Sequence, residues 1–397
     1  MRLSSRAQMI SPSPTLAIDA KAKEMKARGI NVIGFGAGEP DFDTPAHIKE
    51  AAVAAMWGGM TKYTPVAGTN ELREAICQKF KIDQGLDYKP AQIVVSAGAK
   101  HSLYNAMQVL VQPGDEVILP SPYWVSYLEQ IKLAGAEARI VETREDNDFK
   151  LAPAELASAI NSRTKLLILN SPSNPTGAVY SETELKALGE VIVKYDITII
   201  SDEIYEKLIY DGIRHVSIAT LAQELKERTV IINGVSKAYA MTGWRIGYAA
   251  ATASVAGAMT DLQSHSTSNP TSIAQAASTV ALTGDQEPVS RMVVEYTRRR
   301  DYALERLRGI PGVTCSKAGG AFYLFPNVKT CFGKSYKGKT INSASDLAAV
   351  LLDGTQVAVV PGLAFGNDDY IRLSYAISMD SLKEGLDRIN WLFGELE

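Results

Sequence analysis

A lysine and an arginine eight residues apart have the spacing and surroundings to hold a carbonyl cofactor. Lys237 follows the apolar run at 230–232 within a stretch of small residues, and Arg245 lies between Gly243 and Gly247. A lysine at a strand end can form a Schiff base with a carbonyl group, and a nearby arginine can hold a phosphate through two hydrogen bonds. Pyridoxal 5'-phosphate (PLP) needs this combination. Taken alone, the segment would also suit a surface turn.

Three polar residues that follow two other predicted strands would complete such a site. Asp202 comes after the apolar run at 197–201, so its carboxylate could pair with the pyridine nitrogen and keep the ring an electron sink. Tyr205 could hydrogen-bond the ring 3'-oxygen. Asn174, in the turn after 165–170, could contact that oxygen and a substrate carboxylate. A helix N-cap at Asp202 and a purely structural turn around Asn174 are the alternatives.

Two strand-to-helix junctions offer contacts for a phosphate and for a planar ring. Small residues before a predicted helix would let the backbone N–H groups of Ala99 and Lys100 approach a phosphate. Trp124 follows another strand and could stack on a ring, although a core tryptophan fits the local sequence equally well.

One arginine and one glycine-rich loop have the properties of a substrate site. Arg372 lies inside an apolar strand, where burial is costly unless the guanidinium is paired. A bidentate bond to a substrate carboxylate would pair it, and an internal salt bridge is the alternative. The loop 34–42 is rich in glycine, but prolines interrupt the pattern of a dinucleotide-binding loop. We expect instead a loop in which the Gly38 N–H can contact a ligand.

The elements that would position these residues alternate along the chain. Seven predicted strands are apolar throughout and are mostly separated by helices, which is typical of a mostly parallel sheet covered on both faces. The strands are residues 92–96, 116–120, 138–142, 165–170, 197–201, 230–233 and 246–250. Open α/β sheets bind ligands beyond their strand ends, where the polar residues above fall.

After a predicted helix at 288–308, the pattern changes to short strands mixed with helices, which is typical of a separate, smaller α+β domain. A helix at 16–28 and a strand at 32–35 have no obvious place in the large sheet and are expected to pack on this C-terminal part. We therefore predict two domains, with bounds of 46–290 for the large PLP-binding domain and of 1–45 plus 291–397 for the small domain.

The composition is that of an ordinary soluble globular protein. The 397 residues are 46 % apolar and carry a net charge of −3, which argues against nucleic acid or an anionic membrane as a partner. Four scattered histidines offer no metal-ligand spacing, and three distant cysteines indicate reduced thiols in a cytoplasmic protein. We expect neither a signal peptide nor a membrane span. The basic run at 298–300 is predicted to be a solvated helix face.

Together these segments resemble the class I aminotransferases of PLP fold type I, and within them the bacterial and archaeal aspartate aminotransferases. The resemblance extends from Leu16 to the C-terminus. It rests on the segments Gly38-Glu39-Pro40-Asp41-Phe42, Lys62-Tyr63-Thr64-Pro65, Ser121-Pro122-Tyr123-Trp124-Val125-Ser126-Tyr127 and Ser236-Lys237-Ala238-Tyr239-Ala240-Met241-Thr242-Gly243-Trp244-Arg245.

The resemblance implies a role for each candidate residue. Lys237 would be the Schiff-base lysine and the main catalytic residue, assisted by Asp202 and Tyr205. Contacts to PLP would come from Lys237, Ala99, Lys100, Trp124, Asn174, Asp202, Tyr205, Ser236, Arg245 and Tyr63. Substrate contacts would come from Gly38, Trp124, Asn174, Arg372 and Lys100. Tyr63 would reach the phosphate of the neighbouring subunit of a homodimer.

The resemblance also implies the reaction, which is a reversible ping-pong transfer of the amino group from L-aspartate to 2-oxoglutarate. Lys100 is the expected cation for the distal carboxylate, and a solvated lysine at a helix start is the alternative. Some members accept prephenate and carry a basic residue before a Pro-Ser-x-Thr stretch. Here Ser11 precedes Pro12-Ser13-Pro14-Thr15, which argues against prephenate. Because a fold does not fix a reaction, an aromatic or broad specificity, a PLP-dependent lyase and a PLP-binding regulator stay open as well.

Overall fold

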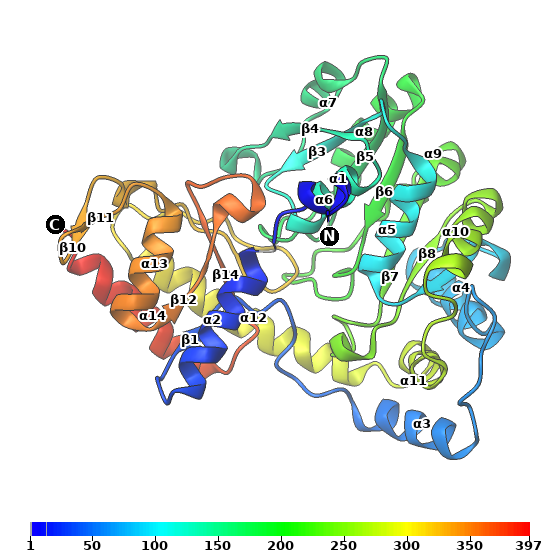
Figure 1. The fold of residues 1–397 in the computed structure, drawn as a ribbon, viewed down its shortest axis with the longest axis horizontal. Coiled ribbons are helices and arrows are strands. Elements are labelled where there is room, and N and C mark those ends of the chain that lie inside the picture. The colour runs from blue at the N-terminus through cyan, green and yellow to red at the C-terminus, as the bar shows by residue number, and fades with distance from the viewer. Residues whose placement is uncertain (1, 13) are drawn as a thin grey trace.

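A seven-stranded sheet forms the centre of the larger part of the molecule (Figure 1). The computed structural model describes residues 2–12 and 14–397. The spatial order of the strands is β2-β8-β7-β6-β5-β3-β4, and β8 is the one strand that runs opposite to the other six. Their bounds are β2 Ile93–Ser96, β3 Glu116–Ser121, β4 Glu137–Glu142, β5 Thr164–Asn170, β6 Thr198–Asp202, β7 Thr229–Gly234 and β8 Gly247–Ala250. The predicted α/β fold with a mostly parallel sheet is confirmed.

Both faces of this sheet are covered by helices, because successive residues of its strands are apolar and point to opposite sides. In β5, Leu166 and Ile168 pack in one core with α5 and α6, while Leu167 and Leu169 pack in another with α7 and α8. The helices of this part are α3 Ala46–Trp57, α4 Asn70–Gln84, α5 Ala99–Leu110, α6 Val125–Leu133, α7 Pro153–Ala159, α8 Glu182–Tyr195, α9 Gln223–Arg228, α10 Ala253–Ser266 and α11 Ser272–Thr283.

The smaller part combines short strands with the C-terminal helices and the N-terminal segment. Strand β1 pairs in parallel with β12, so the N-terminal elements do pack on the C-terminal part as expected. The elements are α1 Ser5–Met9, α2 Pro14–Ala27, β1 Ile33–Gly34, β9 Tyr323–Leu324, β10 Ser335–Tyr336, β11 Lys339–Thr340, α13 Ala344–Thr355, β12 Val357–Ala358, β13 Val360–Pro361, β14 Ile371–Ser374 and α14 Met379–Gly394. Helix α12, Glu287–Arg308, connects the two parts (Figure 1). The exact domain bounds stay a prediction.

The predicted solvated face at 298–300 is wrong for two of its three arginines. Arg299 is 6 % exposed and donates from Nη1 to both carboxylate oxygens of Asp41, at 2.8 and 2.9 Å. Arg300 is fully buried and forms a bidentate pair with Asp211. Only Arg298 is largely exposed. The charges are buried because each guanidinium meets a carboxylate from a distant segment of the chain.

Within the described residues, no helix combines the length and the apolar character that crossing a membrane requires.

Candidate active site

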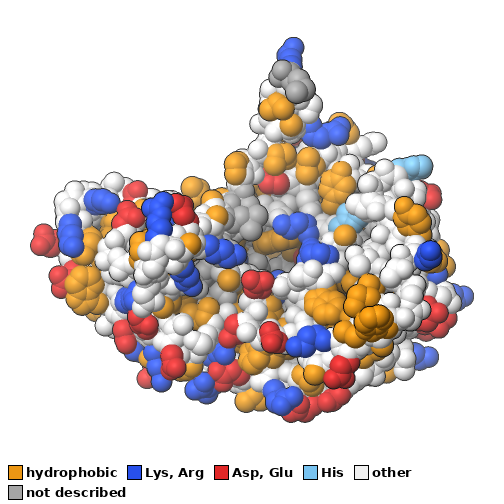
Figure 2. Space-filling model, turned by 60° about the horizontal axis from the view of Figure 1, so that its bottom comes forward, with side chains coloured by type: hydrophobic (Ala, Val, Ile, Leu, Met, Phe, Trp, Pro, Cys, Tyr) orange, Lys and Arg blue, Asp and Glu red, His pale blue; other side chains and the backbone are white. Residues whose placement is uncertain are grey.

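A pocket of about 450 Å³ opens beyond the carboxyl ends of the central strands, and the N-terminal segment and the C-terminal part close its other side. The space-filling view shows a hollow between the two parts of the molecule, with charged side chains around it (Figure 2). Its lining includes eleven of the twelve predicted site residues, from both parts of the chain: Gly38, Ala99, Lys100, Trp124, Asn174, Asp202, Tyr205, Ser236, Lys237, Arg245 and Arg372.

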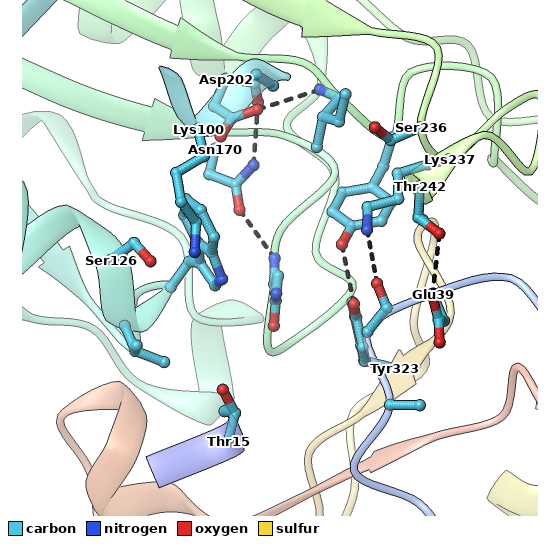
Figure 3. Close-up of a pocket in the computed structure, with 18 of the residues that line it drawn as sticks. Thr15, Glu39, Lys100, Ser126, Asn170, Asp202, Ser236, Lys237, Thr242 and Tyr323 are labelled. Atoms are coloured by element: carbon cyan, nitrogen blue, oxygen red, sulfur yellow. Dashed lines mark hydrogen bonds between the residues drawn. The ribbon is translucent and has the colours of Figure 1, made fainter. Parts of the chain in front are cut away.

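Lys237 lies in the loop that follows β7, and its amine points toward the N-terminal segment (Figure 3). The Nζ atom donates a hydrogen bond to the carbonyl oxygen of Gly38 at 2.6 Å. Enclosure in the pocket lowers the pKa of Lys237 to about 8, against the opposing charge of Glu39 and with help from Arg245. Roughly a tenth of this amine is therefore neutral at pH 7, far more than for an ordinary lysine.

The lowered pKa predicts how Lys237 reacts when the protein carries no cofactor. An amine-selective acylating reagent reacts only with the neutral form, so labelling of Lys237 should rise with a midpoint near pH 8. Labelling of an ordinary lysine has its midpoint roughly two pH units higher. Peptide mass spectrometry of pulse-labelled protein measures the midpoint for Lys237. A midpoint for Lys237 roughly two pH units higher, as for an ordinary lysine, would contradict the lowered pKa.

Asp202 ends β6 and points its carboxylate into the pocket from a fully enclosed position. The hydroxyl of Tyr127 donates to Oδ2 at 2.7 Å, and the backbone N–H of Ile204 donates to Oδ1 at 3.2 Å. Burial raises the pKa of Asp202 to about 6, and the bond from Tyr127 acts against this rise. Asp202 caps no helix and, within the described residues, forms no ion pair. A cationic group in the pocket would offset the free-energy cost of burying this carboxylate.

Arg372 is a buried cation without a carboxylate partner in the described part of the chain. Its side chain comes from β14 and is 2 % exposed. Nη1 donates to Asn174 Oδ1 at 3.0 Å and Nη2 to the carbonyl oxygen of Gly36 at 2.7 Å, while Nε is buried and has no partner. The internal salt bridge considered above is therefore absent among these residues. A guanidinium in this state can bind a carboxylate that enters the pocket.

The junction between β2 and α5 forms a cradle for an anion beside Arg245. A Cβ atom on Gly98 would lie 2.3 Å from Arg245 Nη2, and one on Gly247 would lie 2.1 Å from the backbone nitrogen of Ala99. Only glycine leaves this space open. Arg245 Nη1 donates to the carbonyl oxygen of Thr242 at 2.7 Å. Backbone N–H groups at the start of α5 and a guanidinium together suit a phosphate.

Trp124 and Lys100 form the wall of the pocket on the side of α5 and α6. Lys100 Nζ lies 4.9 Å from the centre of the Trp124 ring, and Trp124 packs edge-on against Tyr127. Trp124 therefore lines the pocket, and Lys100 places a positive charge beside it.

Comparisons with known proteins agree with this geometry. The model of the family "Aminotransferase class I and II" matches residues 30–389. The chain belongs to the class I and II aminotransferases. An aspartate aminotransferase of Geobacillus stearothermophilus is 55 % identical, with 98 % of each chain covered, and an aspartate/prephenate aminotransferase of Nitrosomonas europaea is 48 % identical over 98 % of this chain and 99 % of its own. The crystal structure of the Rhizobium meliloti aspartate aminotransferase superposes with a TM-score of 0.97 at 45 % identity, and 100 % of each chain is covered.

Tyr63 is the one candidate of this aminotransferase that does not line the pocket of its own chain. It lies in the loop after α3 and is 91 % exposed. The loop itself is anchored, because Gln275 of α11 donates to Thr64 Oγ1 at 3.0 Å and Ser272 donates to the carbonyl oxygen of Met60. Tyr63 therefore points outward from its own chain. Its contact with a neighbouring subunit stays a prediction.

Eight pocket residues with polar side chains were not selected from the sequence. They are Thr15, Lys23, Glu39, Ser126, Tyr127, Asn170, Thr242 and Tyr323. Glu39, Ser126, Tyr127 and Thr242 lie within the motifs quoted above, so those motifs carried a usable signal. Tyr323 lies in a short strand with no pattern that marks it.

Glu203, Glu206 and His215 form a second polar cluster, outside the pocket, with possible ligand atoms within 4.8 Å of one another. Lys79 pairs with Glu206, and His215 Nε2 lies 2.9 Å from Glu203. Burial opposes the charge of His215, but Glu203 outweighs burial and raises the pKa of the imidazole. These cations offset the carboxylates, so the cluster is explained as a buried ion network.

Proposed function

We propose that this chain catalyses the reversible transfer of the amino group from L-aspartate to 2-oxoglutarate, with pyridoxal 5'-phosphate as its cofactor. The observation that carries the proposal is the convergence on one pocket of Lys237, Asp202 and Arg372, a buried cation with no carboxylate partner among the described residues. The family and the names of its full-length relatives support the reaction.

The donor set of the pocket fits this cofactor. The phosphate would lie in the cradle of Arg245, Ser236 and the backbone of Ala99 and Lys100. Asp202 would pair with the ring nitrogen, Tyr205 and Asn174 would contact the 3'-oxygen, and Trp124 would cover the ring. When bound, the cofactor supplies an electron sink for the carbanion at the substrate Cα.

The residues of the chain then bind the substrate and move its proton. Arg372 and Asn174 would hold the α-carboxylate together with the N–H of Gly38, and Lys100 would contact the distal carboxylate. As a neutral amine, Lys237 Nζ would accept the proton from the substrate Cα and hold it until it is returned. The N-terminal segment and the C-terminal part would exclude water from this exchange.

Arg372→Lys should raise KM for L-aspartate by about 10²- to 10³-fold, because one bidentate, buried charge pair is worth roughly 3–4 kcal/mol. Binding of the cofactor should change little, because Arg372 faces the substrate side of the pocket. Steady-state kinetics and cofactor titration of the same preparation separate the two effects. A KM within threefold of the wild-type value would remove Arg372 from the substrate site.

The strictness of the preference for aspartate is tested by comparing substrates. We expect kcat/KM for L-aspartate to exceed that for L-phenylalanine and for prephenate, because Lys100 favours a distal carboxylate and Ser11 supplies no cation. Ser13 of the neighbouring stretch lies outside the described residues. Equal values for phenylalanine would favour a broad specificity. Release of ammonia without 2-oxoglutarate would favour a lyase.

We further propose that the chain forms a homodimer whose active sites are shared, and that it is located in the cytoplasm. The support for the homodimer is an exposed apolar surface on α3 and the loop after it: Val53, Met56, Trp57 and Tyr63, of which the last two are 84 % and 91 % exposed. Orange side chains gather in this region of Figure 2. Light scattering should give twice the chain mass, and Trp57→Glu should shift it toward the monomer. A wild-type monomer at micromolar concentration would contradict the dimer.

A further inference from the structure

We propose that Tyr323 is a positioning residue that fixes the hydroxyl of Tyr205 and the guanidinium of Arg372 in one rigid unit. Tyr205 would contact the cofactor and Arg372 the substrate, so Tyr323 would serve both contacts without touching the reacting atoms. The inference rests on the proposed function.

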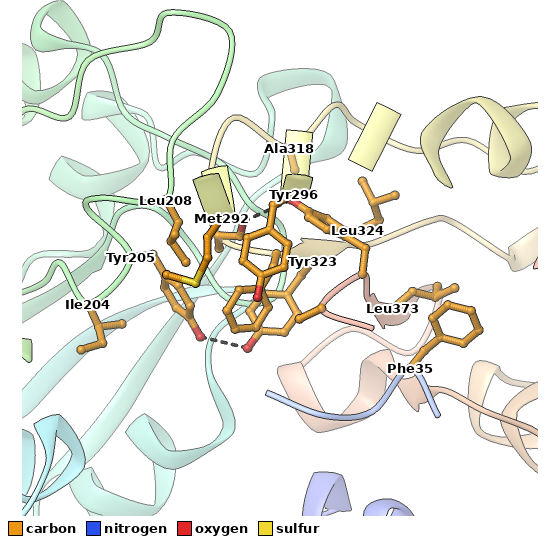
Figure 4. Close-up of a cluster of buried hydrophobic side chains, with 14 of the residues drawn as sticks. Phe35, Ile204, Tyr205, Leu208, Met292, Tyr296, Ala318, Tyr323, Leu324 and Leu373 are labelled. Carbon is orange, nitrogen blue, oxygen red and sulfur yellow. Dashed lines mark hydrogen bonds between the residues drawn. The ribbon is translucent and has the colours of Figure 1, made fainter. Parts of the chain in front are cut away.

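The geometry that carries this proposal lies in the core between the two parts of the molecule (Figure 4). The hydroxyl oxygens of Tyr205 and Tyr323 are 2.9 Å apart. The guanidinium carbon of Arg372 lies 4.5 Å from the centre of the Tyr323 ring, within the range of a cation–π contact. All three side chains are buried, with 4 %, 0 % and 2 % exposure. One aromatic side chain therefore contacts both functional groups.

The strands and rings around Tyr323 leave it little freedom to move. Strands β9 and β14 pair antiparallel, with Tyr323 opposite Ser374, so the backbone that carries Tyr323 is bonded to the strand that carries Arg372. The ring of Phe322 packs against both tyrosines, with centres 4.7 and 5.5 Å away. Gly38 is also close, since a Cβ atom on it would lie 3.2 Å from the Tyr323 hydroxyl.

Counting protons assigns the direction of the hydrogen bond between the two hydroxyls. A tyrosine hydroxyl has one proton to donate. If Tyr205 gives its proton to the 3'-oxygen of the cofactor, Tyr323 must be the donor to Tyr205. Among the described residues, the Tyr323 hydroxyl has this single hydrogen-bond partner. Such a donation orients the Tyr205 proton toward the cofactor and makes Tyr205 a stronger donor.

The test measures the pH midpoint of the absorbance of the bound cofactor, which is independent of turnover. A hydrogen bond donated by Tyr205 to the 3'-oxygen would favour the ionised form of the cofactor. A weaker hydrogen bond should therefore raise the pH midpoint. We expect Tyr323→Phe to raise it by about 0.5 to 1 pH unit, which corresponds to one hydrogen bond. In a Tyr205→Phe background the same substitution should cause no further shift.

Two controls separate this role from a general effect on packing. Tyr375→Phe removes an equally buried hydroxyl, which donates to the carbonyl oxygen of Ala321 at 3.2 Å and does not line the pocket. It should leave the midpoint unchanged. Tyr323→Phe keeps the ring under Arg372, so KM for L-aspartate should rise less than threefold. Near-ultraviolet circular dichroism confirms that each variant is folded.

The outcomes distinguish this inference from the proposed function. The role of Tyr323 would be overturned by an unchanged midpoint in Tyr323→Phe, or by an equal shift in the presence and absence of the Tyr205 hydroxyl. Neither result would contradict the proposed aminotransferase activity. A wild-type protein that acquires no cofactor absorbance would overturn the proposed function itself.

Discussion

Lys237→Ala should lower turnover with L-aspartate by at least about 10⁴-fold, because it removes both the covalent attachment and the base that takes the Cα proton. The variant should still bind PLP, since the phosphate cradle at Arg245 and the carboxylate of Asp202 are untouched. The measurement is steady-state turnover together with a cofactor titration of the same protein.

Lys186→Ala is the matched control for Lys237→Ala. Lys186 is an exposed lysine of α8 that pairs with Glu182 on the surface, so its loss should leave turnover within twofold of wild type. Wild-type turnover in Lys237→Ala would show that another group performs the proton transfer and that the assignment of Lys237 is wrong.

Asp202→Asn should lower kcat by about 10²- to 10³-fold, the loss expected when one preorganised electrostatic partner of a transition state is removed. The substitution keeps the shape of the side chain and a partner for Tyr127 but removes the charge that would hold the ring nitrogen protonated. Asp202→Ala should cost more, because it also leaves the buried hydroxyl of Tyr127 without its acceptor.

The matched control for Asp202→Asn is Asp196→Asn, at an exposed carboxylate that follows α8. It should leave kcat unchanged. If Asp202→Asn retained more than half of the wild-type kcat, the pairing of Asp202 with the ring nitrogen would be contradicted.

The sequence predicts the central sheet well, and for six of its strands the physical reason is burial on both faces, while the edge strand β4 is largely exposed. All seven predicted strands agree with the structure within one residue at either end. Helix α11 was not predicted, because Ser272–Thr283 is rich in alanine and serine and its apolar pattern is weak. Apart from Gln275, its buried face is made of small residues, and the helix packs closely on α3 and α4.

The site was predictable where one residue type at a strand end has a recognisable chemistry, as for Lys237 and Asp202. It was not predictable where two distant segments meet. Tyr323 contacts Tyr205, 118 residues away, and no local pattern marks it. Arg372 was predicted from its charge within an apolar strand, but its contact with the carbonyl oxygen of Gly36, 336 residues away, was not. The prediction that Arg299 is solvated was wrong for the same reason. Its partner Asp41 lies 258 residues away in the sequence.

The most direct test of the account is the absorbance spectrum of the purified protein with PLP, recorded after addition of L-aspartate alone. We predict that the band of the lysine-bound cofactor is lost in proportion to the protein as the aminated cofactor forms, and that 2-oxoglutarate restores it. Without a second substrate, only a ping-pong aminotransferase that accepts aspartate gives this reversible change. A band that is present but unaffected by saturating L-aspartate would contradict the central claim.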